Sequence, residues 1–209
     1  MLRYQCNQVK ILLAPKKSKK NMATVKILIE GFTNADSIAV GTSKEKTCPT
    51  ITLVRDDGIV MICDPGVLDS QQMLVDALQK EGLTIADVNY VFITHSHIDH
   101  YRNIGMFPKA KTLEYWGIWD GGSCEPWKEQ FTQDIRIIKT PGHNYDGLTL
   151  LVATAQGTIA ICGDVFWKEN APTPDPYASD PAELDKSRHT VLTSADFIIP
   201  GHAGMYKVK

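Results

Sequence analysis

The chain has 209 residues, of which 43% are hydrophobic, and its formal net charge at pH 7 is -2. This length suits one sizeable domain with a buried core and is short for two ordinary domains. No apolar stretch approaches the roughly 20 residues that a membrane-spanning helix needs, and the small net charge by itself indicates no polyanionic partner.

The charge is unevenly distributed. Residues 1–21 hold six basic residues and no acidic one, which leaves a formal charge of -8 on residues 22–209. We expect 1–21 to form a basic, disordered tail, and the domain to occupy 22–209. KKSKK in the tail has the composition of a nuclear-localisation patch, but a solvated tail is the commoner outcome for such charge runs. The acidic body counts against a nucleic-acid partner.

The five cysteines are scattered, odd in number and never at CxxC spacing. This pattern predicts free thiols in a reducing compartment, and hence a cytoplasmic protein. Cys63 and Cys162 lie inside apolar runs and are expected to be buried as small hydrophobic residues.

The first predicted elements are strands at 25–30, 51–56 and 59–64, the last two joined by a turn at Asp57-Gly58. A helix should follow from Asp69, as its N-cap, to about Glu81, with Gly82 ending it. Its apolar residues recur at helical spacing: Met73, Leu74, Ala77 and Leu78. Residues 88–94 read as a strand that is apolar on both faces, and therefore central in its sheet.

Strands then alternate with one more helix. The further strands are predicted at 111–114, 135–139, 148–153, 158–162 and 196–200. The helix should start at Asp180-Pro181, where proline suits the first turn, and run to about Leu192. His189 lies on it and is expected at the surface. The alternation indicates an α/β fold.

The sequence HSHIDH directly follows the predicted central strand and carries His95, His97, Asp99 and His100. Two histidines spaced two apart point the same way from an extended segment, and the next two side chains follow as the chain turns into a helix. Burying so many polar groups without partners would be costly. The pattern therefore predicts a metal site rather than a polar surface turn.

Three more candidates follow predicted strands, each directly after a small residue that lets the backbone approach closely: His143, Asp164 and His202. Each of them singly is more often structural. Their recurrence after the HSHIDH motif favours a ligand role. Cys162 lies two residues before Asp164 and could point the same way along a strand, but Asp164 is the preferred ligand.

Together these motifs resemble the metallo-β-lactamase superfamily over nearly all of 25–209. The resemblance implies a single-domain α/β protein with an αβ/βα four-layer sandwich, in which helices lie outside two sheets. It also implies the ligands: His95, His97 and His143 for one metal, Asp99, His100 and His202 for the other, with Asp164 bridging. Asp64 matches an earlier Asp motif whose side chain orients ligands. A turn-forming Asp before Pro-Gly is nearly as good an interpretation.

The resemblance implies a hydrolase. Two divalent ions share a water molecule and lower its pKa towards neutrality, and the resulting metal-bound hydroxide attacks a carbonyl or phosphorus. Asp99 holds this nucleophile or receives its proton. Histidine and carboxylate ligands suit zinc, and also iron or manganese. Seven filled positions favour two metals over the single iron of sulfur dioxygenase relatives.

Segments such as VFITHSHIDHYRNIGMFP and DPAELDKSR resemble stand-alone animal members of the superfamily. This resemblance implies an endoribonuclease that cleaves the 3′ end of histone pre-mRNA, acting as a homodimer in cytosol and nucleus, with no membrane partner. One alternative is a hydrolase of a small ester, thioester or lactone. The other is a non-catalytic metal- or drug-binding protein, against which the filled ligand set counts.

An aromatic stretch, residues 113–131, lies between the second and third ligand blocks and should border the site. Trp116 and Trp119 are candidates for substrate contact, either by stacking on bases or by walling a small apolar pocket. Plain packing is the first expectation, because large aromatic side chains are usually part of the core.

Overall fold

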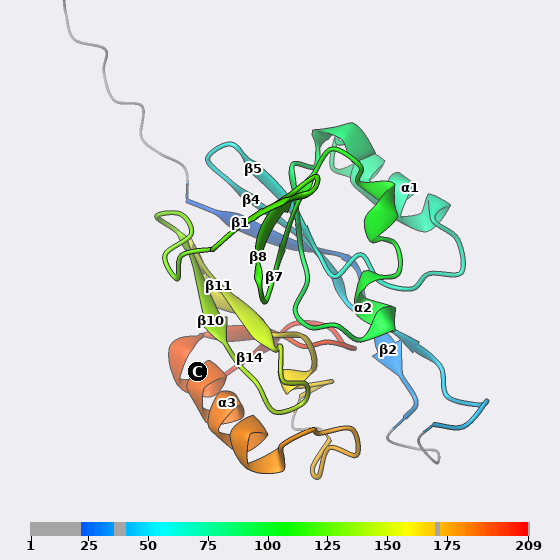
Figure 1. Ribbon diagram of the computed structural model, residues 1–209, viewed down its shortest axis with the longest axis vertical. Coiled ribbons are helices and arrows are strands. Elements are labelled where there is room, and N and C mark those ends of the chain that lie inside the picture. The colour runs from blue at the N-terminus through cyan, green and yellow to red at the C-terminus, as the bar shows by residue number, and fades with distance from the viewer. Residues whose placement is uncertain (1–21, 36–40, 170–171, 209) are drawn as a thin grey trace, which may run out of the picture.

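The computed structural model describes residues 22–35, 41–169 and 172–208 (Figure 1). The expected basic tail, 1–21, lies outside the described residues. Two β-sheets form the body of the protein. The strands of the first sheet lie in the order β1-β4-β5-β6-β7-β8-β9, those of the second in the order β10-β11-β12-β13-β14, and β2 pairs with β3 alone.

The strands are β1 Thr24–Ile29, β2 Phe32–Thr33, β3 Thr47–Cys48, β4 Ile51–Asp56, β5 Ile59–Cys63, β6 Tyr90–Phe92, β7 Lys111–Glu114, β8 Gly117–Asp120, β9 Ser123–Glu125, β10 Ile135–Lys139, β11 Leu148–Thr154, β12 Gly157–Ile161, β13 Phe197–Ile199 and β14 Tyr206–Lys207. The α-helices are α1 Gln72–Lys80, α2 Ile98–Tyr101 and α3 Pro181–Ser194. The 3-10 helices are η1 Ile85–Asp87, η2 Ile104–Met106 and η3 Gly163–Val165.

Side chains that alternate along each strand divide the interior into three apolar layers. Val54 of β4 and Leu150 of β11 face each other's sheets in the central cluster. Leu53 of β4 points the opposite way, towards Leu74 and Leu78 of α1. Likewise, Leu151 of β11 belongs to the cluster that Leu184 and Val191 of α3 cover. The order helix, sheet, sheet, helix confirms the predicted αβ/βα four-layer sandwich.

Most predicted elements are present, with shifted ends. The turn at Asp57-Gly58 joins β4 and β5, and Gly58 has a positive φ of 72°. β6 is the fourth of seven strands and so is central, as predicted. It ends at Phe92 rather than 94, because the Thr94 N–H donates to the Asp64 carboxylate instead of to a neighbouring strand.

Helix α1 differs from the prediction at its start. It begins at Gln72, and no side chain caps it, so the prediction of Asp69 as N-cap is wrong. The Ser70 hydroxyl, one residue before the observed N-cap Gln71, accepts a hydrogen bond from Gln72 N at 3.2 Å. The predicted end holds: Gly82 has φ +70°, and its N–H donates to the carbonyl of Gln79.

Five short strands escape sequence analysis: β2, β3, β8, β9 and β14. Each has only two to four residues, too few for an alternating pattern to stand out. In the described part of the chain, no helix is long and apolar enough to cross a membrane.

The candidate site residues lie along one edge of the sandwich. β6 runs parallel to β5 and β7, and β12 runs parallel to β13, so their carboxyl ends lie together within each sheet. Two backbone hydrogen bonds tie the sheets at this edge: Leu148 N to Thr94 O at 2.8 Å, and Thr50 N to Gly201 O at 2.6 Å. Residues that follow these strands therefore meet between the two sheets.

Candidate metal centre

The HSHIDH segment leaves β6 in extended conformation and turns into α2, as its spacing predicted. His97 is the N-cap of α2 with extended backbone, φ -78° and ψ 135°. The rings of His95 and His97 lie 4.6 Å apart between centroids. Asp99 and His100 are in the first turn of α2, and the ring of His100 lies 4.2 Å from that of His95.

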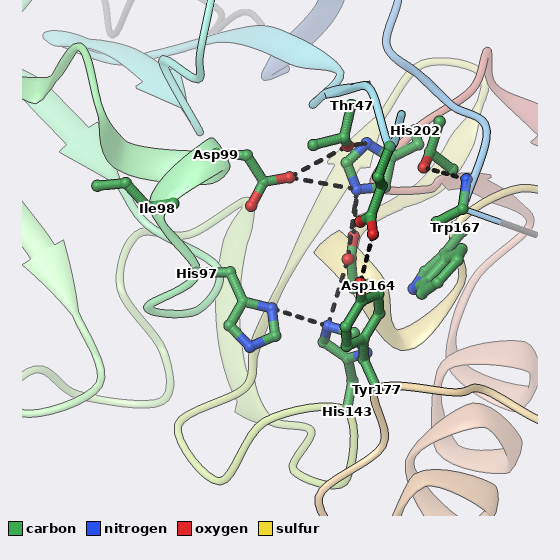
Figure 2. A pocket seen from close by; sticks show the side chains of 12 residues that line it. Thr47, His97, Ile98, Asp99, His143, Asp164, Trp167, Tyr177 and His202 are labelled. Atoms are coloured by element: carbon green, nitrogen blue, oxygen red, sulfur yellow. Dashed lines mark hydrogen bonds and ion pairs between the residues drawn. The ribbon is translucent and has the colours of Figure 1, made fainter. Parts of the chain in front are cut away.

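The three later candidates join this segment from the second sheet. His143 follows β10, Asp164 lies in η3 directly after β12, and His202 follows β13. Figure 2 shows His97 and Asp99 on one side of a cavity and His143, Asp164 and His202 on the other. The ligand atoms fall into two groups, each within 4.8 Å: His95, His97, His143 and Asp164 in one, and Asp99, His100 and His202 in the other.

Asp164 lies where these groups meet. Its Oδ2 is 3.3 Å from Nε2 of both His143 and His202. Its Oδ1 is 3.3 Å from His100 Nε2 and 3.2 Å from His202 Nε2. The carboxylate thus contacts histidines of both groups, as a bridging ligand must.

Hydrogen bonds at Nδ1 fix the orientation of three histidine rings. His100 Nδ1 lies 2.9 Å from Asp64 Oδ2, and His143 Nδ1 lies 2.7 Å from Asp175 Oδ2. His202 Nδ1 lies 2.9 Å from the carbonyl of Cys48. A carboxylate or carbonyl oxygen only accepts, so each Nδ1 donates. Each Nε2 therefore faces the cluster as a potential ligand atom.

His95 is held in the same way through Thr94. The Thr94 hydroxyl donates to Asp64 Oδ2 at 2.7 Å, so it accepts from His95 Nδ1 at 3.1 Å. The His97 ring has the opposite orientation to these four: its Nδ1 faces the cluster and lies 3.0 Å from His143 Nε2.

Asp64 combines the two interpretations that its sequence context allowed. It has a positive φ of 49° before Pro65 and Gly66, and therefore forms a tight turn. It is also 2% exposed, and its carboxylate accepts from Thr94 and from His100. It orients His100 directly and His95 through Thr94.

The donor set fits divalent cations. Three buried atoms in the described part of the chain have no hydrogen-bond partner and lie within the cluster: His95 Nε2, His100 Nε2 and Asp164 Oδ1. Buried polar atoms are rarely left so, and imidazole nitrogens with a carboxylate oxygen are ligands that zinc, iron and manganese accept.

The electrostatics favour cations as well. Burial, and then the nearby His100, lower the pKa of His95, so this ring keeps a free lone pair at neutral pH. Burial raises the pKa of Asp164, but His202, His100 and His143 outweigh it and hold that pKa well below its usual range. Burial also lowers the pKa of His100, but Asp164 and Asp64 raise it well above its usual value. A metal must displace this proton, so binding should strengthen with rising pH.

Comparison with known proteins agrees with the geometry. The sequence profile of the metallo-β-lactamase superfamily matches residues 49–123. A Xenopus laevis protein named metallo-β-lactamase domain-containing protein 1 is 31% identical over 195 residues, covering 88% of this chain and 82% of that protein. The chain belongs to the metallo-β-lactamase superfamily.

The human protein of the same name is 32% identical over 158 residues, which cover 71% of this chain and 59% of that protein. The chain therefore spans less than two thirds of this human relative. A crystal structure of a metallo-β-lactamase-like protein from Thermotoga maritima has a TM-score of 0.69 at 21% identity, covering 90% of this chain and all of that one. An N-acyl homoserine lactone hydrolase with its product N-hexanoyl-L-homoserine at the catalytic metal center has a TM-score of 0.66 at 15% identity, covering 88% and 94%.

A cavity of about 230 Å³ opens at this candidate metal centre of the metallo-β-lactamase superfamily member. Its lining comprises Thr33, Ala35, Glu45, Thr47, His97, Ile98, Asp99, His143, Asp164, Trp167, Tyr177 and His202. The Tyr177 hydroxyl donates to Glu45 Oε2 at 2.5 Å and accepts from Gly41 N at 2.9 Å. The Tyr177 ring lies 5.9 Å from that of Trp167 between centroids.

Sequence analysis did not single out several residues at this site: Glu45, Thr47, Thr94, Trp167, Asp175 and Tyr177. Asp175 and Tyr177 lie in a proline-rich loop, and Thr47 lies in the two-residue strand β3. Such segments have no periodic pattern, and the only signal was an acidic residue, Asp175, between two prolines. Their role depends on which distant segment they contact.

The structure does not bring Trp116 and Trp119 into the cavity. Both lie beside the β7–β8 turn and are 68% and 39% exposed, and Glu114 accepts from the Trp116 N–H and from the Trp119 indole. Packing was therefore the wrong expectation for these two residues. It holds for Tyr115, Trp127 and Phe131, which pack against the central cluster.

The remaining side-chain predictions are simple to place. Cys63 and Cys162 are buried, and burial raises the pKa of both thiols above the usual range. Cys162 packs in the cluster beneath α3 rather than among the candidate ligands, so Asp164 holds the position at the site. His189 is exposed on α3, as expected.

Proposed function

We propose that this chain is a dinuclear metal-dependent hydrolase. The observation that carries the proposal is the Asp164 carboxylate, whose two oxygens contact His143 of one group and His100 and His202 of the other. One metal would be held by His95, His97 and His143, and the other by Asp99, His100 and His202, with Asp164 shared. Zinc is the first candidate, and iron or manganese ions suit the same donors.

When bound, the two ions would supply Lewis acidity and lower the pKa of water towards neutrality. The protein's own part begins with Asp99, which lines the cavity and accepts from the Thr47 hydroxyl at 3.2 Å. Its other carboxylate oxygen remains available to hold a water molecule or take its proton. Tyr177 and Trp167 form part of the cavity wall.

The first candidate substrate is the phosphodiester backbone of RNA, with cleavage at the 3′ end of histone pre-mRNA. It is supported by the resemblance of the ligand segments and of the 180–188 region to stand-alone animal members of the superfamily. Attack on phosphorus by activated water, with metal ions stabilising the charge that develops, is chemistry that this donor set suits. A homodimer of the cytoplasm and nucleus is part of the same proposal.

A specific observation favours a second candidate, a small neutral ester, thioester or lactone. The cavity measures only about 230 Å³, and none of its described lining residues is Lys or Arg, whereas Glu45 and Asp99 are acidic. Such a lining suits an uncharged acyl group better than a polyanion. The fold likeness to a lactone hydrolase is consistent with this chemistry. A non-catalytic metal- or drug-binding protein is the third candidate, and it alone predicts no turnover.

One experiment separates the candidates. Zinc-loaded protein is incubated with an end-labelled histone pre-mRNA 3′ fragment and, separately, with an N-acyl homoserine lactone. The matched variants are Asp99→Asn, which alters the centre, and Asp185→Asn, which makes the same change on exposed α3. We expect hydrolysis by wild type and Asp185→Asn, and a loss of at least about 100-fold in Asp99→Asn, the size typical of removing an acid–base group.

RNA cleavage that depends on Asp99 would support the first candidate, and lactone hydrolysis alone would support the second. No turnover of either substrate by folded, zinc-loaded protein would favour the non-catalytic alternative. Equal activity in Asp99→Asn would contradict the assignment of hydrolysis to this site.

A further inference from the structure

The loop between Asp164 and α3 contains a buried carboxylate that none of the superfamily motifs in this sequence includes. The Asp175 side chain is fully buried, and its Oδ2 lies 2.7 Å from His143 Nδ1. Its other oxygen, Oδ1, accepts from Tyr177 N at 2.8 Å. Both oxygens therefore have a donor, and the carboxylate is fixed between the loop and the candidate metal centre.

The backbone of the same loop also forms hydrogen bonds with the segment that carries His143. Ser179 N donates to the carbonyl of His143 at 3.0 Å, and Asp180 N donates to that of Gly142 at 2.9 Å. Gly142 itself has φ +129°, and a Cβ there would lie 2.1 Å from Leu184 N of α3. The position of the His143 backbone is thus set by α3 and its leading loop, and only the ring remains to be oriented.

We propose that Asp175 is a positioning residue that fixes the ring of His143 with Nδ1 protonated and Nε2 turned towards Asp164. The inference rests on the proposed function, since it gives His143 Nε2 to the metal. An imidazole has one proton to place, and a neighbouring acceptor at Nδ1 keeps it away from the ligand nitrogen. Carboxylates behind ligating histidines typically improve metal affinity about 10- to 100-fold.

Replacing the Asp175 carboxylate by an amide should change which ring nitrogen of His143 carries the proton. In Asp175→Asn, the amide oxygen can still accept from Tyr177 N, but the NH₂ group then faces His143 Nδ1. A donor at that place forces the ring proton to Nε2, the nitrogen that lies 3.3 Å from Asp164 Oδ2. The substitution keeps volume and shape, and so tests orientation rather than packing.

The test uses the full chain in three forms: wild type, Asp175→Asn and, as the matched control, Asp185→Asn on exposed α3. Long-range ¹H–¹⁵N correlation NMR reports which ring nitrogen of His143 carries the proton in metal-free protein. Zinc affinity is measured by competition with a chromophoric chelator, and cobalt-loaded samples give the visible absorption of each site. Circular dichroism and melting confirm that the variants are folded.

We expect the Nδ1–H form of His143 in wild type and Asp185→Asn, and the Nε2–H form in Asp175→Asn. One of two zinc ions should bind about 10- to 100-fold more weakly in Asp175→Asn, with a changed cobalt spectrum. An Nε2–H form in wild type would overturn the proposal without any variant, and so would unchanged zinc affinity in folded Asp175→Asn. If wild type binds no zinc, the proposed function fails, whereas the NMR result still decides whether Asp175 orients His143.

Discussion

Asp64 is the acceptor that links Thr94 and His100 beside the candidate metal centre. Its carboxylate accepts from the Thr94 N–H, the Thr94 hydroxyl and His100 Nδ1 at 2.7 to 2.9 Å, all in the buried interior. Removal of a carboxylate with three buried donors leaves each donor without a partner. Asp64 therefore matters both to stability and to the direction of two histidine rings.

The variant Asp64→Ala should lose about 3 kcal/mol of unfolding free energy, because an orphaned buried donor costs on the order of 1–3 kcal/mol. The measurement is urea unfolding with EDTA present, so that metal binding does not contribute. Asp185→Ala on exposed α3 is the control, expected within about 0.5 kcal/mol of wild type. A loss below about 1 kcal/mol in Asp64→Ala would contradict this account of the network.

Gly201 directly precedes His202, and a small residue at this position was expected to let the backbone approach the site closely. A Cβ at this position would lie 1.9 Å from Asp164 Oδ1, an atom without room to move because it faces His100 and His202. We expect Gly201→Ala to displace Asp164 and to weaken zinc binding by at least about 10-fold, a loss of the size seen for disturbed supporting groups.

Zinc titration with a competing chelator checks this expectation. Gly105→Ala is the matched control, since a Cβ there meets nothing within 4 Å. Equal affinities in the two glycine variants would show that Asp164 needs no such clearance.

At the scale of elements, α3 acts as a base for the His143 segment. Asp180 caps the helix by accepting from Ala182 N and Glu183 N, and Leu184 lies against Gly142. The Ser187 hydroxyl donates to the carbonyl of Pro141 at 2.6 Å. The helix thus has a positional role besides burying the outer face of the second sheet.

Asp180→Ala should lower the unfolding free energy by about 1 kcal/mol, the usual value of an N-cap side chain. The midpoint of urea unfolding gives the size of the effect. Asp180→Ser is the control and should retain most of the stability, because serine caps about equally well. If serine and alanine behave alike, the cap contributes nothing and the helix start is held by tertiary packing.

The elements also show where sequence reasoning stops. Long apolar runs such as β4, β11 and β12 were predictable, because their pattern extends over five or more residues. The N-cap of α1 was misplaced by two residues, since several polar residues there are plausible caps. The pairs β2–β3 and β8–β9 were missed, because two to four residues carry too little pattern.

At the scale of the molecule, the sandwich joins two sheets, and the candidate ligands follow their strand ends. A metal that binds only the folded arrangement must stabilise the whole chain. At a zinc concentration of 100 times Kd, the gain is about 2.7 kcal/mol for one site. For a chain of this size we expect a rise in Tm of several degrees, at about 2–4 °C per kcal/mol.

Thermal unfolding with excess zinc and with EDTA measures this difference. The double variant His95→Ala/His202→Ala removes a ligand from each group and should show no difference. A zinc-dependent rise in Tm that survives in this variant would place the metal elsewhere.

The sequence by itself determined the local chemistry of this protein. HSHIDH lies directly after a strand, and three more candidates each follow a strand and a small residue, so the α/β class and the seven candidate residues could be predicted from the sequence, and the resemblance that these motifs carry implied the superfamily and the ligand set. Local spacing suffices here because an extended segment that enters a helix fixes the directions of its side chains within a few residues.

Only the tertiary structure decided which residues orient those seven side chains and which residues line the cavity beside them. Asp175 reaches His143 and Tyr177 reaches Glu45 across 32 and 132 positions of the chain, whereas Trp116 and Trp119 do not line the cavity despite their place between ligand blocks. Contacts between loops depend on how two sheets pack, and packing is a property of the assembled core rather than of any one segment. For this reason the candidate ligands were predictable, and the residues that orient and enclose them were not.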